Sequence, residues 1–366
     1  MKKLGFGTMR LELSNSDTKE VNMPLFIQLV DYFMENGYNY FDTAYTYLNG
    51  NSERALEEAL VDRYPRNSYL IADKLPIFNL DNSNQMEEIF NTQLERMGVD
   101  YFDYYMLHNV SSKHKLKFTD IDSFGFIADK KRQGLIKHIG ISCHDGPEFL
   151  EDIICNHPEI EFVQLQINYL DWKDNIIQSH NCYEIAKKYN LDVIVMEPLK
   201  GGMLAKTDSY VSKLFDDYAH VKPVEYALGF CRDLENVKVV LSGMNNMDDL
   251  RENINIFENK SKLSKEDLIF LEKVSDVIYN YNLVECTGCN YCLDNCPMHI
   301  NISKYLNLYN SQKISKNHSL AMYYRNMITE YSSGPEDCIG CDNCSQYCPQ
   351  NINISKYMKE LTNLFQ

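Results

Sequence analysis

Two stretches of the chain carry the residue types and spacing best suited to chemistry, and they are near copies of one another. The first reads CTGCNYCLDNCP over 286–297 and the second CIGCDNCSQYCP over 338–349, so both follow the pattern CxxCxxCxxxCP. Thiolates three residues apart can wrap one face of an iron–sulfur cluster, and the proline after the fourth cysteine turns the chain away from that face. The two runs therefore predict two 4Fe–4S clusters, which carry single electrons.

This spacing resembles that of bacterial two-cluster ferredoxins, in which the fourth cysteine of each run ligates the other cluster. Zinc or disulfides are the alternatives, but zinc sites usually take two CxxC-type pairs, which two identical four-cysteine runs fit poorly. The resemblance implies one cluster held by Cys286, Cys289, Cys292 and Cys348, and a second held by Cys338, Cys341, Cys344 and Cys296. We expect the other four of the 12 cysteines to be buried apolar thiols, namely Cys143, Cys155, Cys182 and Cys231.

The cysteine runs belong to a longer internal repeat. CPMHINISKYL at 296–306 returns as CPQNINISKYM at 348–358, and the same offset of 52 residues separates Cys286 from Cys338. One half of this region is therefore a copy of the other. Between the halves we expect a helix over about 319–331, which makes the module longer and more helical than a minimal ferredoxin.

Upstream of the repeat, short β-branched or aromatic runs alternate with amphipathic helical patterns. Three of the helical patterns end at a glycine that precedes the next strand: Gly37, Gly98 and Gly134. Eight strand–helix alternations predict a (β/α)8 TIM barrel. The expected strands are 4–9, 38–42, 69–74, 102–108, 136–142, 162–167, 192–197 and 237–242.

The predicted fold class is α/β, with a TIM barrel followed by a smaller, mainly α-helical two-cluster ferredoxin-like domain. We assign the barrel to residues 1–260, a linker helix to 261–282 and the duplicated cluster domain to 283–366. The linker helix opens at Ser264, with Asp267 three residues on, as in a capping box.

Composition narrows the class of partner. The 366 residues carry a formal net charge of -16, which argues against nucleic acid or an anionic membrane as the partner. No apolar run approaches the length of a membrane span, and the opening MKKLGFGTMRL lacks the apolar core of a signal peptide. We therefore expect a cytoplasmic protein.

Four polar side chains fall at the C-terminal ends of adjacent predicted strands, where barrel enzymes place their chemistry. Asp42 ends the second strand and Tyr47 follows it, while Lys74 and His108 end the third and fourth. This combination suits a general acid acting on a carbonyl. We expect Lys74, held by Asp42, to lower the pKa of Tyr47, and His108 to orient the substrate oxygen.

These residues also carry a family resemblance. Residues 1–260 resemble the aldo–keto reductases in GFGTMR, FDTAYTY followed by GNSE, LH at 107–108, GLIKHIGIS and RENI at 251–254. The resemblance implies a nicotinamide dinucleotide extended across the barrel rim and a small carbonyl or alcohol as substrate. It also implies a catalytic tetrad of Asp42, Tyr47, Lys74 and His108, with Tyr47 as the proton donor.

The same resemblance assigns positions to the dinucleotide. Cys143 stands where asparagine is usual, and Met196 where many members have an aromatic side chain against the nicotinamide. The acids at 248–249 replace the basic residues of NADP-preferring members, so NAD is slightly favoured over NADP. The implied cofactor-binding residues are Ser142, Gln164, Met196, Pro198, Leu199, Gly201, Ser242 and Asn253.

Three functions are compatible with both halves of the chain. The first is a reductase whose clusters relay single electrons to or from a ferredoxin-like partner. Because a hydride carries two electrons and a cluster carries one, this function calls for a converter such as a flavin, for which the sequence shows no motif. The second is the same reductase with structural or redox-sensing clusters. The third is an electron-transfer protein that uses the barrel as a scaffold, and the intact tetrad argues against it.

Overall fold

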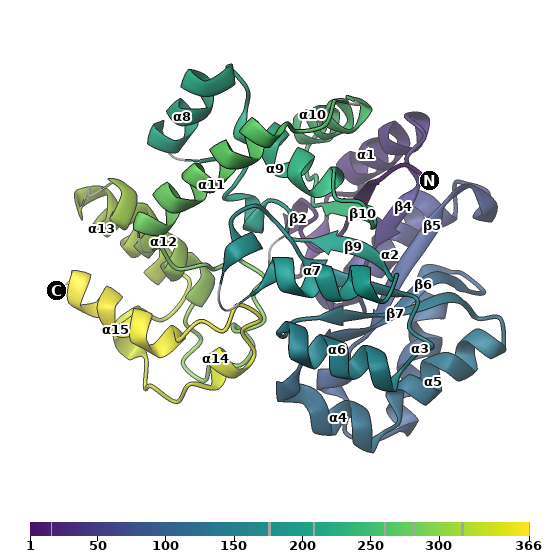
Figure 1. The fold of residues 1–366 in the computed structure, drawn as a ribbon. Helices are drawn as coiled ribbons and strands as arrows, with labels where there is room; N and C mark the ends of the chain where they lie inside the picture. Colours follow the sequence, from purple (N-terminus) through teal and green to yellow (C-terminus); the bar gives the residue numbers. More distant parts are fainter. Residues whose placement is uncertain are drawn as a thin grey trace. The chain divides into compact units, whose positions relative to one another are not determined.

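The computed structural model describes residues 1–15, 17–174, 177–207, 209–259, 261–281, 283–315 and 318–365. The chain divides into two compact units (Figure 1). Unit 1 comprises Met1–Pro198 and Ala227–Leu263, and unit 2 comprises Leu199–Tyr226 and Ser264–Gln366.

Unit 1 is built on a closed barrel of eight parallel strands (Figure 1). The barrel closes because β1 pairs with β10 on one side and with β4 on the other. All eight predicted strands are confirmed, with ends shifted by no more than about two residues. They are β1 (Leu4–Gly7), β4 (Tyr40–Asp42), β5 (Leu70–Leu75), β6 (Phe102–Val110), β7 (Ile136–Cys143), β8 (Phe162–Gln166), β9 (Asp192–Met196) and β10 (Val237–Ser242).

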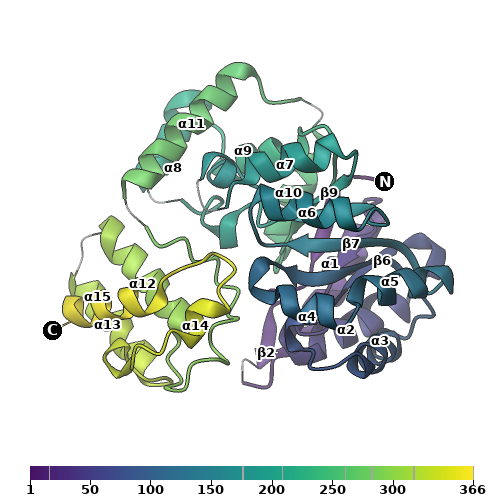
Figure 2. The same cartoon turned by 60° about the horizontal axis from the view of Figure 1, so that its bottom comes forward.

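Helices surround these strands in both views (Figures 1 and 2). In α1 (Met23–Glu35) the buried side chains recur at helical spacing, from Phe26 through Leu29 and Val30 to Phe33, so one face packs on the barrel. The other helices are α2 (Asn51–Leu56), α3 (Asn84–Met97), α4 (Lys115–Asp120), α5 (Ser123–Arg132), α6 (Pro147–Asn156), α7 (Ser179–Lys188) and α10 (Met247–Glu258), with α9 (Pro223–Arg232) spanning the unit boundary. Two features were not predicted from the sequence: α4, and a short hairpin of β2 (Leu13–Asn15) and β3 (Glu20–Val21).

Unit 2 is helical. It contains α8 (Ser209–Ala219), α11 (Lys265–Asn280), α12 (Ile302–Ser315), α13 (His318–Thr329), α14 (Asn343–Gln346) and α15 (Ile354–Phe365). The capping box predicted at Ser264 and Asp267 is present at the start of α11. Helix α8, which was not predicted from the sequence, packs on α11, where the rings of Tyr218 and Phe270 stack with centroids 4.1 Å apart.

The internal repeat extends to the backbone of unit 2. Gly288 and Gly340, 52 residues apart, have φ of 68° and 70°, and His299 and Asn351 have φ of 53° and 54°. Helices α12 and α15 begin at the same offset, at Ile302 and Ile354. The duplication predicted from the cysteine spacing is therefore a duplication of local structure. Within the described ranges, no helix has both the length and the apolar character needed to cross a bilayer.

Candidate active site and cluster site

The alternation of side chains along a strand places the predicted catalytic residues on the interior face of the barrel. Tyr40, Ala72 and Met106 belong to one buried apolar cluster contributed by several strands. Side chains two residues apart lie on the same face of a strand. Asp42, Lys74 and His108 each follow one of these core residues by two positions, so the core continues directly into a polar rim.

Lys74 and Asp42 form a buried ion pair at this rim. The Lys74 side chain is fully buried, and its Nζ donates to Asp42 Oδ1 at 2.5 Å and to the Thr43 carbonyl at 2.6 Å. Gln164 Nε2 donates to Asp42 Oδ2 at 3.0 Å. Burial raises the pKa of Asp42 despite the adjacent Lys74. The pair therefore joins β4, β5 and β8 through hydrogen bonds that leave neither carboxylate oxygen unsatisfied.

Tyr47 and His108 lie together beside this pair. Their rings meet edge to face with centroids 5.8 Å apart, and Lys74 Nζ lies 4.8 Å from the Tyr47 ring centroid. Burial, and after it the positive charge of Lys74, lowers the pKa of His108 well below its usual range, so the imidazole is neutral at pH 7. The structure thus brings all four predicted catalytic side chains into one group.

The predicted effect of Lys74 on Tyr47 is not found. Burial, followed by the charge of Asp42, raises the pKa of the Tyr47 phenol well above its usual value. Lys74 donates to Asp42 and Thr43, and its charge does not outweigh burial and the charge of Asp42 at the Tyr47 phenol. The phenol is consequently held protonated, ready to donate rather than prone to ionise.

A chain of buried hydroxyls fixes the loop that carries Tyr47, and its members were not identified as site residues from the sequence. Ser52 Oγ lies 2.6 Å from Thr8 Oγ1 and 2.8 Å from Thr43 Oγ1, and Thr8 Oγ1 donates to the Asp42 carbonyl at 2.8 Å. Thr8 and Ser52 fall in the GFGTMR and GNSE segments, so their position in those motifs was the signal available.

The residues assigned to the nicotinamide end of a cofactor occupy neighbouring strands. Ser142 and Gln164 are direct partners in the register of β7 and β8, and both are buried. The Ser142 hydroxyl also lies 3.0 Å from His144 Nε2. Met196 ends β9, and Pro198 is the last residue of the first segment of unit 1, Met1–Pro198. A hydroxyl and a carboxamide side by side are suitable partners for the carboxamide of a nicotinamide, so this donor set fits the group.

The residues assigned to the adenosine end meet one another on a different face. Asn253 Nδ2 donates to Ser242 Oγ at 2.8 Å, and both residues are buried. Leu241, not Ser242, belongs to the interior cluster, so Ser242 faces α10. The two acids predicted to disfavour NADP, Asp248 and Asp249, lie at the start of α10. Asp249 donates its backbone N–H to the N-cap Asn246, and Asp248 is exposed with Arg251 3.8 Å away.

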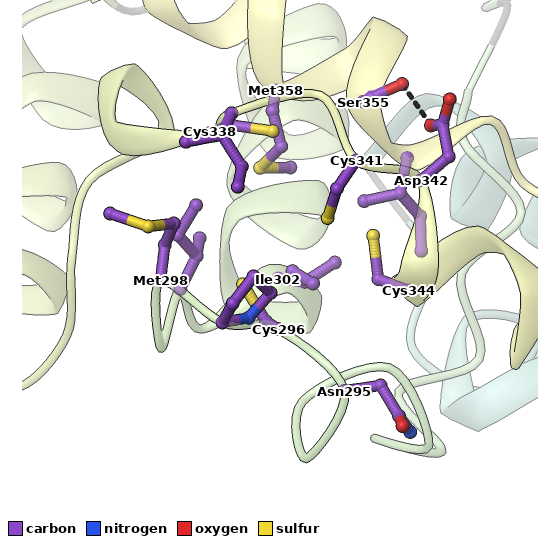
Figure 3. Close-up of a pocket in the computed structure, with 14 residues that line it drawn as sticks. Asn295, Cys296, Met298, Ile302, Cys338, Cys341, Asp342, Cys344, Ser355 and Met358 are labelled. Carbon is purple, nitrogen blue, oxygen red and sulfur yellow. Dashed lines mark hydrogen bonds between the residues drawn. The ribbon is translucent and has the colours of Figure 1, made fainter.

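The cysteines of unit 2 gather in crossed sets. One pocket is lined by Cys296 from the first run together with Cys338, Cys341 and Cys344 from the second (Figure 3). Burial and then the neighbouring thiols of this set raise the pKa of Cys344 to about 11. In the described ranges no three His, Cys, Asp or Glu side chains gather as closely as a single metal ion requires. The four thiols instead surround a cavity, and a wall of soft sulfur donors suits an iron–sulfur cluster.

The other set gathers around Cys292. Burial is the main cause of the raised pKa of this thiol. The neighbouring thiols of Cys286, Cys289, Cys348 and Cys344 raise the pKa further. Cys348, from the second run, thus lies beside the first three cysteines of the first run. Outside the two runs, Cys143, Cys182 and Cys231 are buried as expected, whereas the prediction for Cys155 was wrong, because its thiol is exposed 3.1 Å from Tyr189 Oη.

Within unit 2, the segment that continues the chain after β9 packs against the first cysteine run. Leu199 and Gly201, both assigned to the cofactor, lie in this segment. Between them, the buried Lys200 donates from Nζ to Glu285 Oε2 at 2.6 Å, one residue before Cys286. Gly201 has φ of 65°, and a Cβ placed on it would lie 2.5 Å from the Thr287 carbonyl oxygen. Only glycine allows the two backbones to approach this closely.

Two family models match the chain and divide it between them. Residues 3–276 match the aldo/keto reductase family, and residues 285–352 match a 4Fe-4S dicluster domain. Among curated proteins, an aldo-keto reductase of Mycobacterium sp. (strain MCS) is 26% identical over 226 residues, covering 62% of this chain and 74% of its own. The uncharacterized oxidoreductase YqkF of Bacillus subtilis is 24% identical over 309 residues, covering 74% of this chain and 96% of its own.

Solved structures share the fold of the barrel. An aldo-keto reductase from Bacillus halodurans in its holo form superimposes with a TM-score of 0.61 at 21% identity, covering 74% of this chain and 91% of its own. A Klebsiella pneumoniae aldo-keto reductase in complex with NADPH gives a TM-score of 0.58 at 16% identity, with coverage of 75% and 90%.

The close approach at Gly201 leads to a first prediction. In Gly201→Ala the added Cβ meets the Thr287 carbonyl, and we expect unit 2 to be destabilised by about 1–3 kcal/mol, with less iron and sulfide bound per chain. Gly202→Ala is the matched control, because Gly202 also has positive φ but a Cβ there meets nothing within 4 Å. Anaerobic metal analysis and denaturant unfolding measure both. Equal effects of the two changes would mean that backbone strain, not the contact with Thr287, sets the requirement for glycine.

Proposed function

Because the chain belongs to the aldo/keto reductase family, we propose that it is an oxidoreductase that reduces a small carbonyl, or oxidises the matching alcohol, with a nicotinamide dinucleotide. The observation that carries this proposal is the buried Lys74–Asp42 pair with Tyr47 and a neutral His108 beside it. Buried, fully hydrogen-bonded charges at a barrel rim are costly to stability and typical of catalytic centres.

Each residue of this group has a distinct role. When bound, a reduced nicotinamide would supply the hydride for the carbonyl carbon. Tyr47 donates its phenolic proton to the carbonyl oxygen, so that hydride and proton together give the alcohol. Neutral His108 donates a hydrogen bond that orients the same oxygen. Lys74, held by Asp42, places a positive charge 4.8 Å from the Tyr47 ring centroid, which stabilises the phenolate left after proton transfer.

For the cofactor, we propose Ser142 and Gln164 as partners of the nicotinamide carboxamide and Met196 as a side chain against its ring. Pro198, Leu199 and Gly201 would lie along the pyrophosphate, and Ser242 and Asn253 at the adenosine. The presence of NADPH in the Klebsiella pneumoniae relative supports a nicotinamide dinucleotide in general. Exposed Asp248 would repel a 2′-phosphate, which favours NAD.

For unit 2, we propose two 4Fe–4S clusters with crossed ligands. Cys286, Cys289, Cys292 and Cys348 would hold one, and Cys338, Cys341, Cys344 and Cys296 the other, in agreement with the two gatherings of thiols. The clusters would pass single electrons to or from a ferredoxin-like partner. A second candidate role is structural, and the contact of Lys200 and Gly201 with the loop before Cys289 favours it.

The role of Tyr47 gives the second prediction. Tyr47→Phe keeps the ring and removes the proton donor, so we expect carbonyl reduction to fall at least about 100-fold in kcat while iron and sulfide content stay unchanged. Steady-state assays with a panel of small aldehydes, including nitrobenzaldehyde, and NADH or NADPH measure this. Tyr45→Phe, on the same loop, is the control. Retained turnover in Tyr47→Phe would show that another group supplies the proton.

The crossed ligands give the third prediction, which paired substitutions can test. Cys296→Ser with Cys341→Ser should damage one cluster only, leaving about four iron atoms per chain. Cys296→Ser with Cys289→Ser should damage both and leave almost none. Iron and sulfide analysis and the electron paramagnetic resonance of the reduced protein give the counts. If each run instead holds its own cluster, the two results are exchanged.

The role of the clusters gives the fourth prediction. If they lie on the electron path, NADH should bleach their visible absorbance under anaerobic conditions, and bound flavin should be found in the purified protein. NADPH in place of NADH tests the cofactor preference in the same experiment. Carbonyl reduction without bleaching by either nucleotide would remove the relay and leave the structural role.

A further inference from the structure

Two carboxyl groups lie fully buried on the outer side of the barrel wall, immediately behind Lys74. Glu53 on α2 and Asp73 on β5 each have 0% exposure. Asp73 precedes Lys74 in the strand, so its side chain points away from the interior, to which Lys74 points. Neither belongs to the tetrad or to the positions assigned to the cofactor.

Each carboxyl has one oxygen with a partner and one without. Glu53 Oε2 accepts from Arg96 Nη1 on α3 at 2.7 Å, and Asp73 Oδ1 accepts the backbone N–H of Lys74 at 2.8 Å. Glu53 Oε1 and Asp73 Oδ2 are buried and accept no hydrogen bond from any described group. The two carboxyls lie close enough to be hydrogen-bonding partners of each other.

Charge balance then requires a proton. Of the cations close by, Lys74 is paired with Asp42 and Arg96 with Glu53, which leaves Asp73 with no cation of its own in the described structure. A second unpaired carboxylate beside Glu53 in a dry site would be strongly destabilising. One proton placed between the two unpartnered oxygens removes the excess charge and satisfies both atoms with a single hydrogen bond.

The same network holds the backbone of Lys74 on both sides. Asp73 Oδ1 accepts its N–H, and Gln93 Nε2 donates to its carbonyl at 3.2 Å. The Tyr105 hydroxyl donates to Gln93 Oε1 at 2.5 Å, which fixes the amide orientation. Strand β4 pairs with β5 only as far as Asp42 and Ala72. Beyond that point, side chains rather than β4 form the hydrogen bonds to the Lys74 peptide groups.

We propose that Glu53 and Asp73 share one proton as a buried acid pair and that this pair is a positioning element for Lys74. The proposal rests on the proposed function only for the role of Lys74, because the shared proton follows from burial and charge. Asp73 acts through the backbone of Lys74 and through charge. When the pair holds its proton, Asp73 adds no negative charge near Tyr47.

The charged and titratable groups around the pair define what its proton would affect. They are Arg96 from α3, Lys74 from β5, Tyr105 from β6, and Tyr45 and Tyr47 from the loop before α2. Burial, and then the charge of Glu53, raises the pKa of Asp73 well above the usual carboxyl range. The folded chain therefore keeps a proton that the unfolded chain loses near pH 4, so this contribution to stability falls as pH rises above that value.

A direct test detects the proton without turnover. The infrared spectrum of the full-length protein at pH 7 should contain the carbonyl stretch of a buried, protonated carboxylic acid that Asp73→Asn removes. Asp103→Asn is the matched control, because Asp103 is equally buried but has two cation partners, Arg66 at 2.7 Å and Lys137 at 3.2 Å. The same band in the wild type and in Asp73→Asn would overturn the shared proton, as would its absence from the wild type.

Two further measurements distinguish a positioning role of Asp73 from a merely structural one. Between pH 5 and 9, wild-type unfolding should release about one proton more than the unfolding of Asp73→Asn, whose stability should fall less as pH rises. With nitrobenzaldehyde as the probe, Asp73→Asn should stay within about threefold of wild-type kcat at pH 7 and lose less activity on the alkaline side. Asp73→Leu, which cannot accept the Lys74 N–H, should lose more than about tenfold.

The design keeps the outcomes distinct. If Asp73→Asn does not fold, Glu53→Gln makes the mirror change and should remove the same infrared band. If nitrobenzaldehyde is not reduced by the wild type, the proposed function is in question while the infrared and unfolding results still decide the acid pair. Equal pH–rate profiles in wild type and Asp73→Asn would overturn the positioning role even with the band assigned.

Discussion

The rim of the barrel depends on a buried ion pair. Lys74 and Asp42 are removed from water almost completely, and such pairs commonly cost more in desolvation than their attraction returns. The pair is retained only because each remaining donor and acceptor is satisfied, by the Thr43 carbonyl and by Gln164. Those partners fix the spacing of β4, β5 and β8. A site that costs stability and orders three strands is best explained by its chemistry.

Hydrogen bonds on both sides of the barrel wall hold Lys74 and its partners in place. The hydroxyl chain of Thr8, Ser52 and Thr43 fixes the backbone that accepts from Lys74. On the outer side, Asp73 and Gln93 hold the peptide groups of Lys74 itself. The lysine is therefore constrained at its ammonium, its N–H and its carbonyl. Such rigidity keeps its charge at a constant place relative to the Tyr47 ring, as electrostatic stabilisation requires.

Much of this could be predicted from the sequence because it depends on periodicity. Strands recur as short β-branched and aromatic runs, and a period of two places Asp42, Lys74 and His108 on one face once their strands are known. The partners of the Lys74 peptide groups, unlike its predicted ion-pair partner Asp42, could not be found in this way. Asp73 is its sequence neighbour, but Gln93 reaches the Lys74 carbonyl from α3, and Glu53 reaches Asp73 from α2. The pKa of Tyr47 was misjudged for a related reason, since the sequence gives the neighbours of a group but not the balance of burial and charge.

The cluster region was predictable in a different way, through its repeat. An offset of 52 residues in sequence became an offset of 52 in backbone conformation, because the same glycines and turns recur. What the repeat could not show is the assignment of 199–226 to unit 2, since those residues precede the cysteine runs by many positions and share no pattern with them. That assignment depends on contacts such as Tyr218 with Phe270 and Lys200 with Glu285.

The packing of 199–202 within unit 2 bears on the role of the clusters. A hydride and a single electron cannot be exchanged directly, so electron flow between them would need a converter. A structural role of the clusters needs none. The segment that follows β9 is bonded through Lys200 to the residue before Cys286, and its Gly201 lies against Thr287. Within unit 2, the backbone after Pro198 is therefore held by the residues on either side of Cys286, and a structural role of the clusters would act at that contact.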